Sequence, residues 1–251
     1  MEFPGYSTLS VGNPFGAPVL RVAETSSTME DARALAARGA PSGTAVTADF
    51  QSAGRGRFRD RSWSGERGRD LLFTLMLELD LEGAAAFPLR VGLAVCRAVE
   101  GLSGAIAFRL KWPNDLLADG MKVCGILCES SGGRYFAGIG VNCAAREFPL
   151  GLRHPATSLE AVLGACVDRF DLLGRILDEL SRSFSRPDWI SEVAERLYRR
   201  GQPLRFLEGR PEDGRVVEGV LVGLGKGGEL LIDIDGAGIR SYSSGEILRN
   251  E

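Results

Sequence analysis

The segments KVCGILCE at residues 122–129 and RYFAGIGV at residues 134–141, joined by SSGG at 130–133, decide the fold of this chain. Each is a mainly apolar run of eight residues, and the Ser/Gly cluster between them is typical of a turn, so the sequence predicts two consecutive strands. Gly138 and Gly140 alternate along the second strand and leave one of its faces without side chains. Such a face often marks the close approach of a ligand or another backbone. It is not a dinucleotide-binding fingerprint, because no helix with a third glycine follows.

Further strands and helices are expected around this pair. The strands are expected at 19–23, 43–49, 71–78 and 105–110, and the helices at 27–38, 84–100, 157–164, 168–184 and 189–199. Ser27 and Glu30 have the spacing of a capping box at the start of the first helix. Residues 1–18, rich in Gly and Pro, are expected to form an irregular arm. This succession predicts an α+β fold with a mixed, largely antiparallel sheet.

The pattern changes after Gly201, where short strands separated by Gly/Asp turns follow one another. They are expected at 203–206, 215–224, 229–234 and 238–242, and are followed by Glu246, Ile247 and Leu248. About 50 residues of this kind predict a small β-barrel. We therefore expect two domains, 1–202 and 203–251.

Composition excludes several classes of protein. A net charge of -3 over 251 residues argues against a general nucleic-acid binder. No run of about 18 apolar residues is present, and residues 1–18 contain Glu2 but no Lys or Arg, so we expect neither a membrane span nor a secretory signal and place the protein in the cytoplasm. Five cysteines without a CxxC pair and a single histidine, His154, argue against a zinc site or a Ser-His-Asp triad.

Lysine is rare in this sequence. Of 30 basic residues only Lys111, Lys122 and Lys226 are lysines, and the first two lie within twelve residues of each other. A compact, rotatable ammonium and a planar guanidinium are not interchangeable at a tight charged site. The two neighbouring lysines are therefore candidates for a chemical role, although a chance compositional bias remains the alternative.

Residues 54–63, GRGRFRDRSW, contain four arginines and cannot form a core face. The glycines make a helix or strand unfavourable, so a mobile surface loop is expected. Glycine lets backbone N–H groups approach an anion closely, and each guanidinium offers a planar fork of donors to phosphate or carboxylate. An Arg/Gly linker or a nonspecific nucleic-acid contact is the alternative interpretation.

Five segments in this order resemble the biotin protein ligase family. They are 27–28 (ST), 51–57 (QSAGRGR), 111–115 (KWPND), 122–127 (KVCGIL) and 138–142 (GIGVN). The resemblance runs from about residue 20 to the end, with the small barrel matching the SH3-like C-terminal domain of the family. It implies a sheet with helices mainly on one side, a fold shared with lipoate-handling enzymes. Family members make biotinyl-5′-AMP from biotin and ATP with Mg²⁺, and then biotinylate one lysine of a carboxylase's biotin carboxyl carrier domain.

The resemblance also implies roles for individual residues. Lys122 is expected to bridge the biotin carboxylate and the phosphate, and Asp115 to orient or deprotonate the acceptor amine. The implied catalytic residues are Lys122, Arg57, Lys111 and Asp115. The implied biotin-binding residues are Ser27, Thr28, Met29, Gln51, Arg55, Gly56, Arg57, Lys122, Leu127, Gly138 and Gly140. The implied ATP or adenylate-binding residues are Arg55, Arg57, Trp63, Asn114, Lys122 and Asn142. No metal site made by the protein alone is implied, since Mg²⁺ enters with ATP.

Three features depart from the family pattern. The Arg/Gly loop is one residue longer, so the residues between Arg57 and Trp63 do not map one to one. Met29 stands where Asn often follows Ser-Thr, and Asp70 stands where a neutral Asn is common. The sequence offers no physical account of Asp70.

Three other functions are alternatives to that of a monofunctional biotin ligase. Some members carry an N-terminal winged helix and act as repressors, but only 26 residues precede Ser27, so we expect the monofunctional type, with no DNA partner. A lipoate or octanoate ligase on the same fold is an alternative, although the histidine motif of that family has no counterpart here. A non-catalytic biotin-binding protein is the third. Homodimers occur in the family, and no membrane partner is expected.

Overall fold

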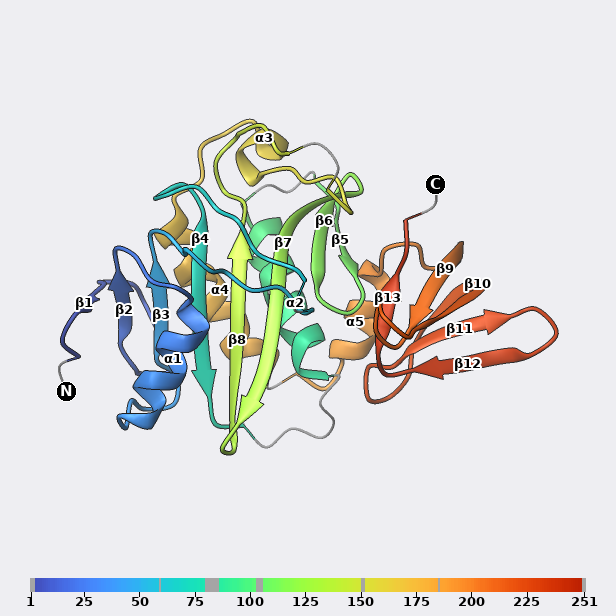
Figure 1. Ribbon diagram of the computed structural model, residues 1–251, viewed down its shortest axis with the longest axis horizontal. Helices are drawn as coiled ribbons and strands as arrows, with labels where there is room; N and C mark the ends of the chain where they lie inside the picture. Colours follow the sequence, from blue (N-terminus) through green and yellow to red (C-terminus); the bar gives the residue numbers. More distant parts are fainter. Residues whose placement is uncertain are drawn as a thin grey trace.

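The computed structural model describes residues 3–58, 60–79, 86–102, 106–149, 152–184 and 186–249. A large sheet and a small C-terminal sheet lie side by side (Figure 1). Along the large sheet the strands follow the order β1-β2-β3-β4-β8-β7-β6-β5. Their bounds are β1 Ser7–Thr8, β2 Val19–Val22, β3 Ala45–Ala48, β4 Leu71–Leu77, β5 Phe108–Lys111, β6 Asp115–Ala118, β7 Met121–Ser131 and β8 Arg134–Val141. The pair β2–β3 is parallel and the other pairs are antiparallel, which confirms the predicted α+β class with a mixed sheet.

The hairpin β7–β8 lies near the middle of this sheet. Its register sets Gly125 opposite Gly140 and Leu127 opposite Gly138. The turn consists of Gly132 and Gly133, both with positive φ, a backbone conformation that glycine adopts without steric cost. Strand β4 pairs with the other edge of β8, so the bare glycine face is held in the interior of the sheet and not at its edge.

Helices cover both faces of the large sheet, unequally. Their bounds are α1 Thr28–Ala37, α2 Ala86–Glu100, α3 Leu159–Leu163, α4 Arg169–Ser183 and α5 Trp189–Arg196. Helices α2, α4 and α5 share one buried cluster with Ala45, Leu75 and Ala137 of the sheet. The alternate residues Val46, Met76 and Phe136 pack with α1 on the opposite face. The expectation of helices mainly on one side is therefore confirmed, with α1 alone opposite among these five.

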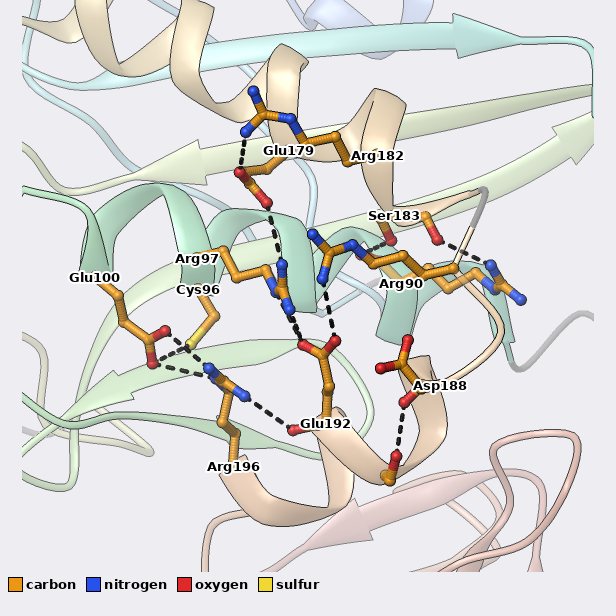
Figure 2. A network of polar contacts seen from close by, with 12 residues as sticks. Arg90, Cys96, Arg97, Glu100, Glu179, Arg182, Ser183, Asp188, Glu192 and Arg196 are labelled. Carbon is orange, nitrogen blue, oxygen red and sulfur yellow. Dashed lines mark hydrogen bonds and ion pairs between the residues drawn. The ribbon is translucent and has the colours of Figure 1, made fainter.

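A network of ion pairs joins α2, α4 and α5 (Figure 2). Arg97 of α2 binds Glu192 of α5 through Nε at 2.9 Å and lies 3.7 Å from Glu179 of α4. Arg196 of α5 reaches back to Glu100 of α2 at 3.1 Å. We call this cluster the rear network. In this network the guanidinium of Arg97 contacts carboxylates of two other helices, α4 and α5. The pair between Arg196 and Glu100 is a second link between α5 and α2.

The C-terminal sheet has the strand order β12-β11-β10-β9-β13. The bounds are β9 Pro203–Glu208, β10 Arg215–Leu224, β11 Leu230–Ile234, β12 Gly238–Tyr242 and β13 Gly245–Ile247. Trp112 joins it to the large sheet, since its ring lies 5.8 Å from that of Phe206 and its Nε1 donates to the carbonyl of Gly228 at 3.0 Å. The segment that follows β5 is thereby packed against the C-terminal sheet.

Several predicted local features differ in the structure. Ser7 and Thr8 of the expected irregular arm form β1, because they pair with Arg21 and Leu20 of β2. Ser27 caps α1 by accepting from the Met29 N–H at 3.3 Å, but Glu30 pairs with Arg55 and does not complete the capping box. Helix α5 ends at Arg196, three residues early. The expected starts of α2 at residue 84 and of β5 at residue 105 lie outside the described residues. No described helix combines the length and apolar character needed to cross a membrane.

Candidate active site

A cleft of about 900 Å³, counted out to open solvent, lies over the glycine face of β7 and β8. Its walls come from the N-terminus of α1, the Arg/Gly loop, the β5–β6 turn and β13 of the C-terminal sheet. It brings together all the residues implied for catalysis, biotin binding or ATP binding by the family resemblance, except Asn142. Those residues are Ser27, Thr28, Met29, Gln51, Arg55, Gly56, Arg57, Trp63, Lys111, Asn114, Asp115, Lys122, Leu127, Gly138 and Gly140.

Neutral polar groups form one end of the cleft. Gln51 Oε1 accepts from the backbone N–H of Thr28 at 2.7 Å and from its hydroxyl at 3.0 Å. The Thr28 hydroxyl also lies 2.9 Å from the hydroxyl of Thr74 on β4. Thr74 was missed in the sequence, although it is the one polar residue in the apolar strand LLFTLML. This end therefore offers hydroxyl and amide groups without a net charge.

Glycine lets aromatic and thioether groups lie directly on the strands. A Cβ atom at Gly140 would come within 2.5 Å of the Trp63 ring, and one at Gly125 within 2.6 Å. A Cβ at Gly138 would lie 3.0 Å from Cε of Met29. The bare face is thus in contact with Trp63 and Met29, while the predicted contact of Trp63 with a ligand remains a prediction.

The described part of the Arg/Gly loop forms a small hairpin, where the sequence predicted a mobile surface loop without strand pairing. The N–H of Gly56 donates to the Arg61 carbonyl and that of Trp63 to the Gly54 carbonyl, both at 2.9 Å. The Phe58 ring lies between the guanidinium groups of Arg57 and Arg61, 4.5 and 4.4 Å away. Residue 59 lies outside the described part of the chain.

The three loop arginines that line the cleft have different partners. Arg55 pairs at the rim with Glu30 at 2.6 Å and Glu129 at 3.5 Å. Arg57 donates to the backbone carbonyl of Gly245 at 2.8 Å, and its buried Nε meets no acceptor among the described residues. Burial lowers the pKa of Arg57 from its ordinary value. Arg57 therefore has a buried Nε–H without an acceptor beside the cleft.

The two neighbouring lysines enter the cleft from β7 and β5, the strands on either side of β6. Lys122 Nζ pairs with Asp115 Oδ1 at 2.7 Å, and Asp115 is the β6 partner of Lys111 on β5. Lys111 is only 4% exposed, and its Nζ contacts the ring of His154. Burial lowers the pKa of Lys111 to about 8, because the loss of water around the ammonium outweighs the attraction of Asp115 and Glu246.

Glu246 of β13 and His154 complete this charged end, and sequence reasoning had assigned neither to it. Glu246 pairs with Arg61 at 2.6 Å and lies 3.5 Å from Nε2 of His154. Although burial by itself raises the pKa of Glu246, its contacts with His154 and Arg61 hold it well below its ordinary range. The one available sequence signal was that His154 is the only histidine.

The side chains of two asparagines in the motifs, Asn114 and Asn142, hydrogen-bond to backbone carbonyls. Asn114 lines the cleft, with its Nδ2 donating to the Ile126 carbonyl at 2.8 Å. Asn142 lies outside the residues that line it, and its Nδ2 donates to the carbonyls of Thr157 at 3.0 Å and Lys122 at 3.4 Å. The structure brings it to the backbone of Lys122 and not to the cavity.

The acid at position 70 now has a physical explanation. Asp70 is fully buried, and the guanidinium of Arg146 donates to both of its carboxylate oxygens, at 2.7 and 2.6 Å. It also accepts from the backbone N–H groups of Cys143 at 3.2 Å and Glu66 at 3.1 Å. A buried guanidinium in contact with this position requires a carboxylate, which a neutral amide would not supply.

The cleft carries an excess of positive charge in an acidic protein. Five of its side chains are cationic, namely Arg55, Arg57, Arg61, Lys111 and Lys122, against the two carboxylates Asp115 and Glu246. No group of His, Cys, Asp or Glu among the described residues could hold a metal ion. The arrangement suits a polyanion such as a nucleotide, bound next to a neutral polar pocket.

Comparison with known proteins agrees with this geometry. The profile of the Biotin/lipoate A/B protein ligase family matches residues 21–144. The structure "Biotin protein ligase from Aquifex aeolicus in complex with biotin and ATP" superposes with a TM-score of 0.81 at 32% identity, over 93% of this chain and 99% of that one. The fold and the cleft therefore define a protein of the biotin/lipoate ligase class.

Sequence relatives narrow the class. The Mycobacterium tuberculosis biotin–[acetyl-CoA-carboxylase] ligase is 30% identical over 90% of this chain and 87% of its own. The Bacillus subtilis bifunctional ligase/repressor BirA is 37% identical over 61% of this chain, and that match spans about half (49%) of the relative's length. The chain belongs to the biotin protein ligase family, which confirms the resemblance seen in the sequence.

Proposed function

We propose that this protein activates biotin with ATP to biotinyl-5′-AMP and transfers the biotinyl group to a lysine of a biotin carboxyl carrier domain. The observation that carries the proposal is the two-ended cleft, neutral and polar at Thr28, Gln51 and Thr74 and cationic around Lys122. A neutral bicyclic head group suits the first end. A carboxylate that must approach a phosphate suits the second.

The head-group end would bind the ureido ring of biotin. A ureido group has a carbonyl acceptor and N–H donors, and Ser27, Thr28 and Gln51 offer complementary hydroxyl and amide groups. Leu127 and Met29, packed beside Gly138, supply apolar surface for the ring system. Few convergent polar groups in an otherwise apolar pocket fix the orientation of a small ligand.

The cationic end would assist the first half-reaction. Attack of the biotin carboxylate on the α-phosphorus brings two anions together, and pyrophosphate leaves as the new acyl-phosphate bond forms. The ammonium of Lys122 can contact both reacting groups, and the guanidinium of Arg57, which lines the cleft, can donate to the phosphate. Donors already directed at the developing charge stabilise the transition state without reorganising.

Asp115 would act in the second half-reaction. In the absence of ligand it pairs with Lys122 at 2.7 Å. Once Lys122 turns to the adenylate, the Asp115 carboxylate is free to orient the acceptor amine and accept its proton. That amine attacks the biotinyl carbonyl, an amide bond forms and AMP leaves. Asn114 and Trp63 would flank the nucleotide, and Asn142 would support it from behind through the Lys122 backbone.

Mg²⁺ would enter with ATP. The described residues hold no carboxylate cluster that could bind the ion alone, whereas the phosphates of the nucleotide are good Mg²⁺ ligands. Bound Mg²⁺ would neutralise phosphate charge during the displacement. Lys111, Lys122 and Arg57 of this chain would bind the same phosphates.

The test is a labelling reaction with purified protein, Mg-ATP, biotin and an apo carrier domain, followed by intact mass. The expected result is one biotinyl group per carrier domain, abolished when the acceptor lysine is changed to arginine. Parallel reactions with lipoate and octanoate examine the related ligase activity. Preference for either acid, or tight biotin binding without any ATP–pyrophosphate exchange, would contradict the proposal.

A further inference from the structure

His154 lies on the segment between β8 and α3, outside every motif used above, yet its ring reaches the charged end of the cleft. The segment is anchored there by its own backbone. The N–H of Lys122 donates to the Pro155 carbonyl at 2.8 Å, and the N–H of Thr157 donates to the Lys122 carbonyl at 3.0 Å. The imidazole is therefore placed relative to Lys122 by two main-chain hydrogen bonds and is only 19% exposed.

The Nε2 atom of His154 faces two different groups. Lys111 Nζ lies within hydrogen-bond distance of it, and Glu246 Oε1 is 3.5 Å away. A ring nitrogen either accepts or donates, depending on whether it carries a proton. An unprotonated Nε2 accepts from the Lys111 ammonium, whereas a protonated Nε2 donates to Glu246 and repels Lys111.

The other charged groups around this contact come from several elements. Arg61 of the Arg/Gly loop holds the second oxygen of Glu246, and Asp115 of β6 attracts Lys111. Lys122 and Arg61 oppose the charge on Lys111. A buried ammonium surrounded by other cations needs an acceptor that directs it, and His154 supplies that acceptor without adding negative charge that would repel a phosphate.

We propose that His154 is a positioning residue, whose neutral imidazole holds the Lys111 ammonium in the cleft for the phosphates of ATP. This role rests on the proposed function. A protonated imidazole cannot accept from the ammonium, so protonation of His154 breaks the contact and weakens ATP binding. Binding of the biotin head group, at the opposite end of the cleft, does not depend on this contact.

The contact is tested directly by NMR, because the chain contains one histidine and an untagged protein therefore gives one set of imidazole signals. The ¹⁵N resonances of labelled protein report which ring nitrogen of His154 accepts and which donates. Lys111→Met and Glu246→Gln each remove one of the two groups that face Nε2, so each should shift the Nε2 resonance. An Nε2 resonance that Lys111→Met leaves unchanged overturns the inference.

Its role at ATP is tested by biotin-dependent ATP–pyrophosphate exchange. His154→Ala should raise KM for ATP about tenfold, whereas His154→Gln, which keeps an acceptor oxygen, should stay within about threefold and lose the acid limb of the pH profile. Arg153→Ala, an exposed neighbour, is the matched control and should behave as wild type.

Equal losses in the Ala and Gln variants, with wild-type pH profiles, would show that His154 only fills space and would overturn the inference alone. Wild-type protein that shows no exchange at all would overturn the proposed function and, with it, the role of His154 at ATP. The NMR measurement distinguishes failure of this inference from failure of the proposed function, because it detects the contact between His154 and Lys111 without turnover.

Discussion

Arginine serves opposite purposes in the rear network and in the cleft. Behind the sheet, Arg97 lies among the carboxylates of Glu192 and Glu179, and Arg196 faces Glu100 (Figure 2). In the cleft, Arg55, Arg61 and Lys122 have carboxylate partners, but Arg57 has only a backbone carbonyl and Lys111 a neutral ring. The rear network is neutralised within the protein. The cleft retains positive charge that only a ligand can neutralise.

This difference separates stability from function. A desolvated cation without a counter-ion is unfavourable in the free protein, so the cleft carries an energetic cost that the rear network avoids. An anionic ligand removes that cost when it binds. Substitutions in the rear network should therefore lower stability and leave chemistry intact, whereas substitutions of cleft cations should impair chemistry without lowering stability.

The largest effect is expected for Lys122→Ala. Loss of the ammonium removes charge stabilisation where carboxylate and phosphate meet, which should lower kcat/KM for ATP–pyrophosphate exchange by about 10²–10³, or about 3–4 kcal/mol. The side chain is 26% exposed, so the melting temperature should change little. A loss below threefold in the exchange assay would show that the ammonium of Lys122 does not stabilise the transition state.

The next effect is expected behind the sheet, for Arg97→Met. This change leaves two acids of the rear network without their shared guanidinium and should destabilise the fold by about 2–3 kcal/mol, measured by urea unfolding. Exchange activity at 25 °C should stay within about twofold. Arg175→Met, which removes an exposed pair with Asp171, is the control and should cost less than about 0.5 kcal/mol. Loss of activity without loss of stability would break the comparison.

A smaller effect is expected for Gly140→Ala. The added methyl group would overlap the Trp63 ring, forcing it off the glycine face at a cost of about 1–2 kcal/mol in biotin affinity, measured by calorimetry. Gly223→Ala places a methyl group in open space and should leave affinity unchanged. Equal affinities in both variants would mean that Trp63 can move from Gly140 without cost.

The smallest effect concerns pH and Lys111. Its pKa is about 8 when folded and 10.5 ordinarily, so between these values the unfolded chain binds more protons and stability rises with pH. Below pH 8 the full penalty of the buried ammonium is present. Lys111→Met also loses the attraction of Asp115 and Glu246, so it should be more stable than wild type at pH 7.5 by only about 1 kcal/mol, and this advantage should shrink by pH 10. A constant difference in unfolding free energy across this range would contradict the lowered pKa.

Local patterns predicted much of the fold. The strands around 122–141 and the helix at 168–184 were placed within a few residues, because alternating or 3.6-residue apolar spacing is visible in a short window. The arm was mispredicted, since Ser7 and Thr8 become a strand only by pairing with β2, ten or more residues away. The capping role predicted for Glu30 was likewise wrong, because its carboxylate pairs with Arg55.

The chemistry of the cleft was predicted in part for the same reason. Residues in contiguous motifs, such as Lys122 and Arg57, were found because rare lysines and Gly-flanked arginines are conspicuous in one dimension. Thr74, His154 and Glu246 were missed, because each reaches the cleft from a strand or segment distant in sequence. Their neighbours along the chain carry no sign of a site.

By itself the sequence determined the fold class, the family and the residue types of the reacting site, because periodicity, composition and short motifs are local properties. Only the tertiary structure decided which charges meet. It placed Glu246 of the C-terminal sheet against Arg61, His154 against Lys111, and Arg146 against Asp70. Electrostatic energy depends on distance and burial in space, and neither can be read from separation along the chain.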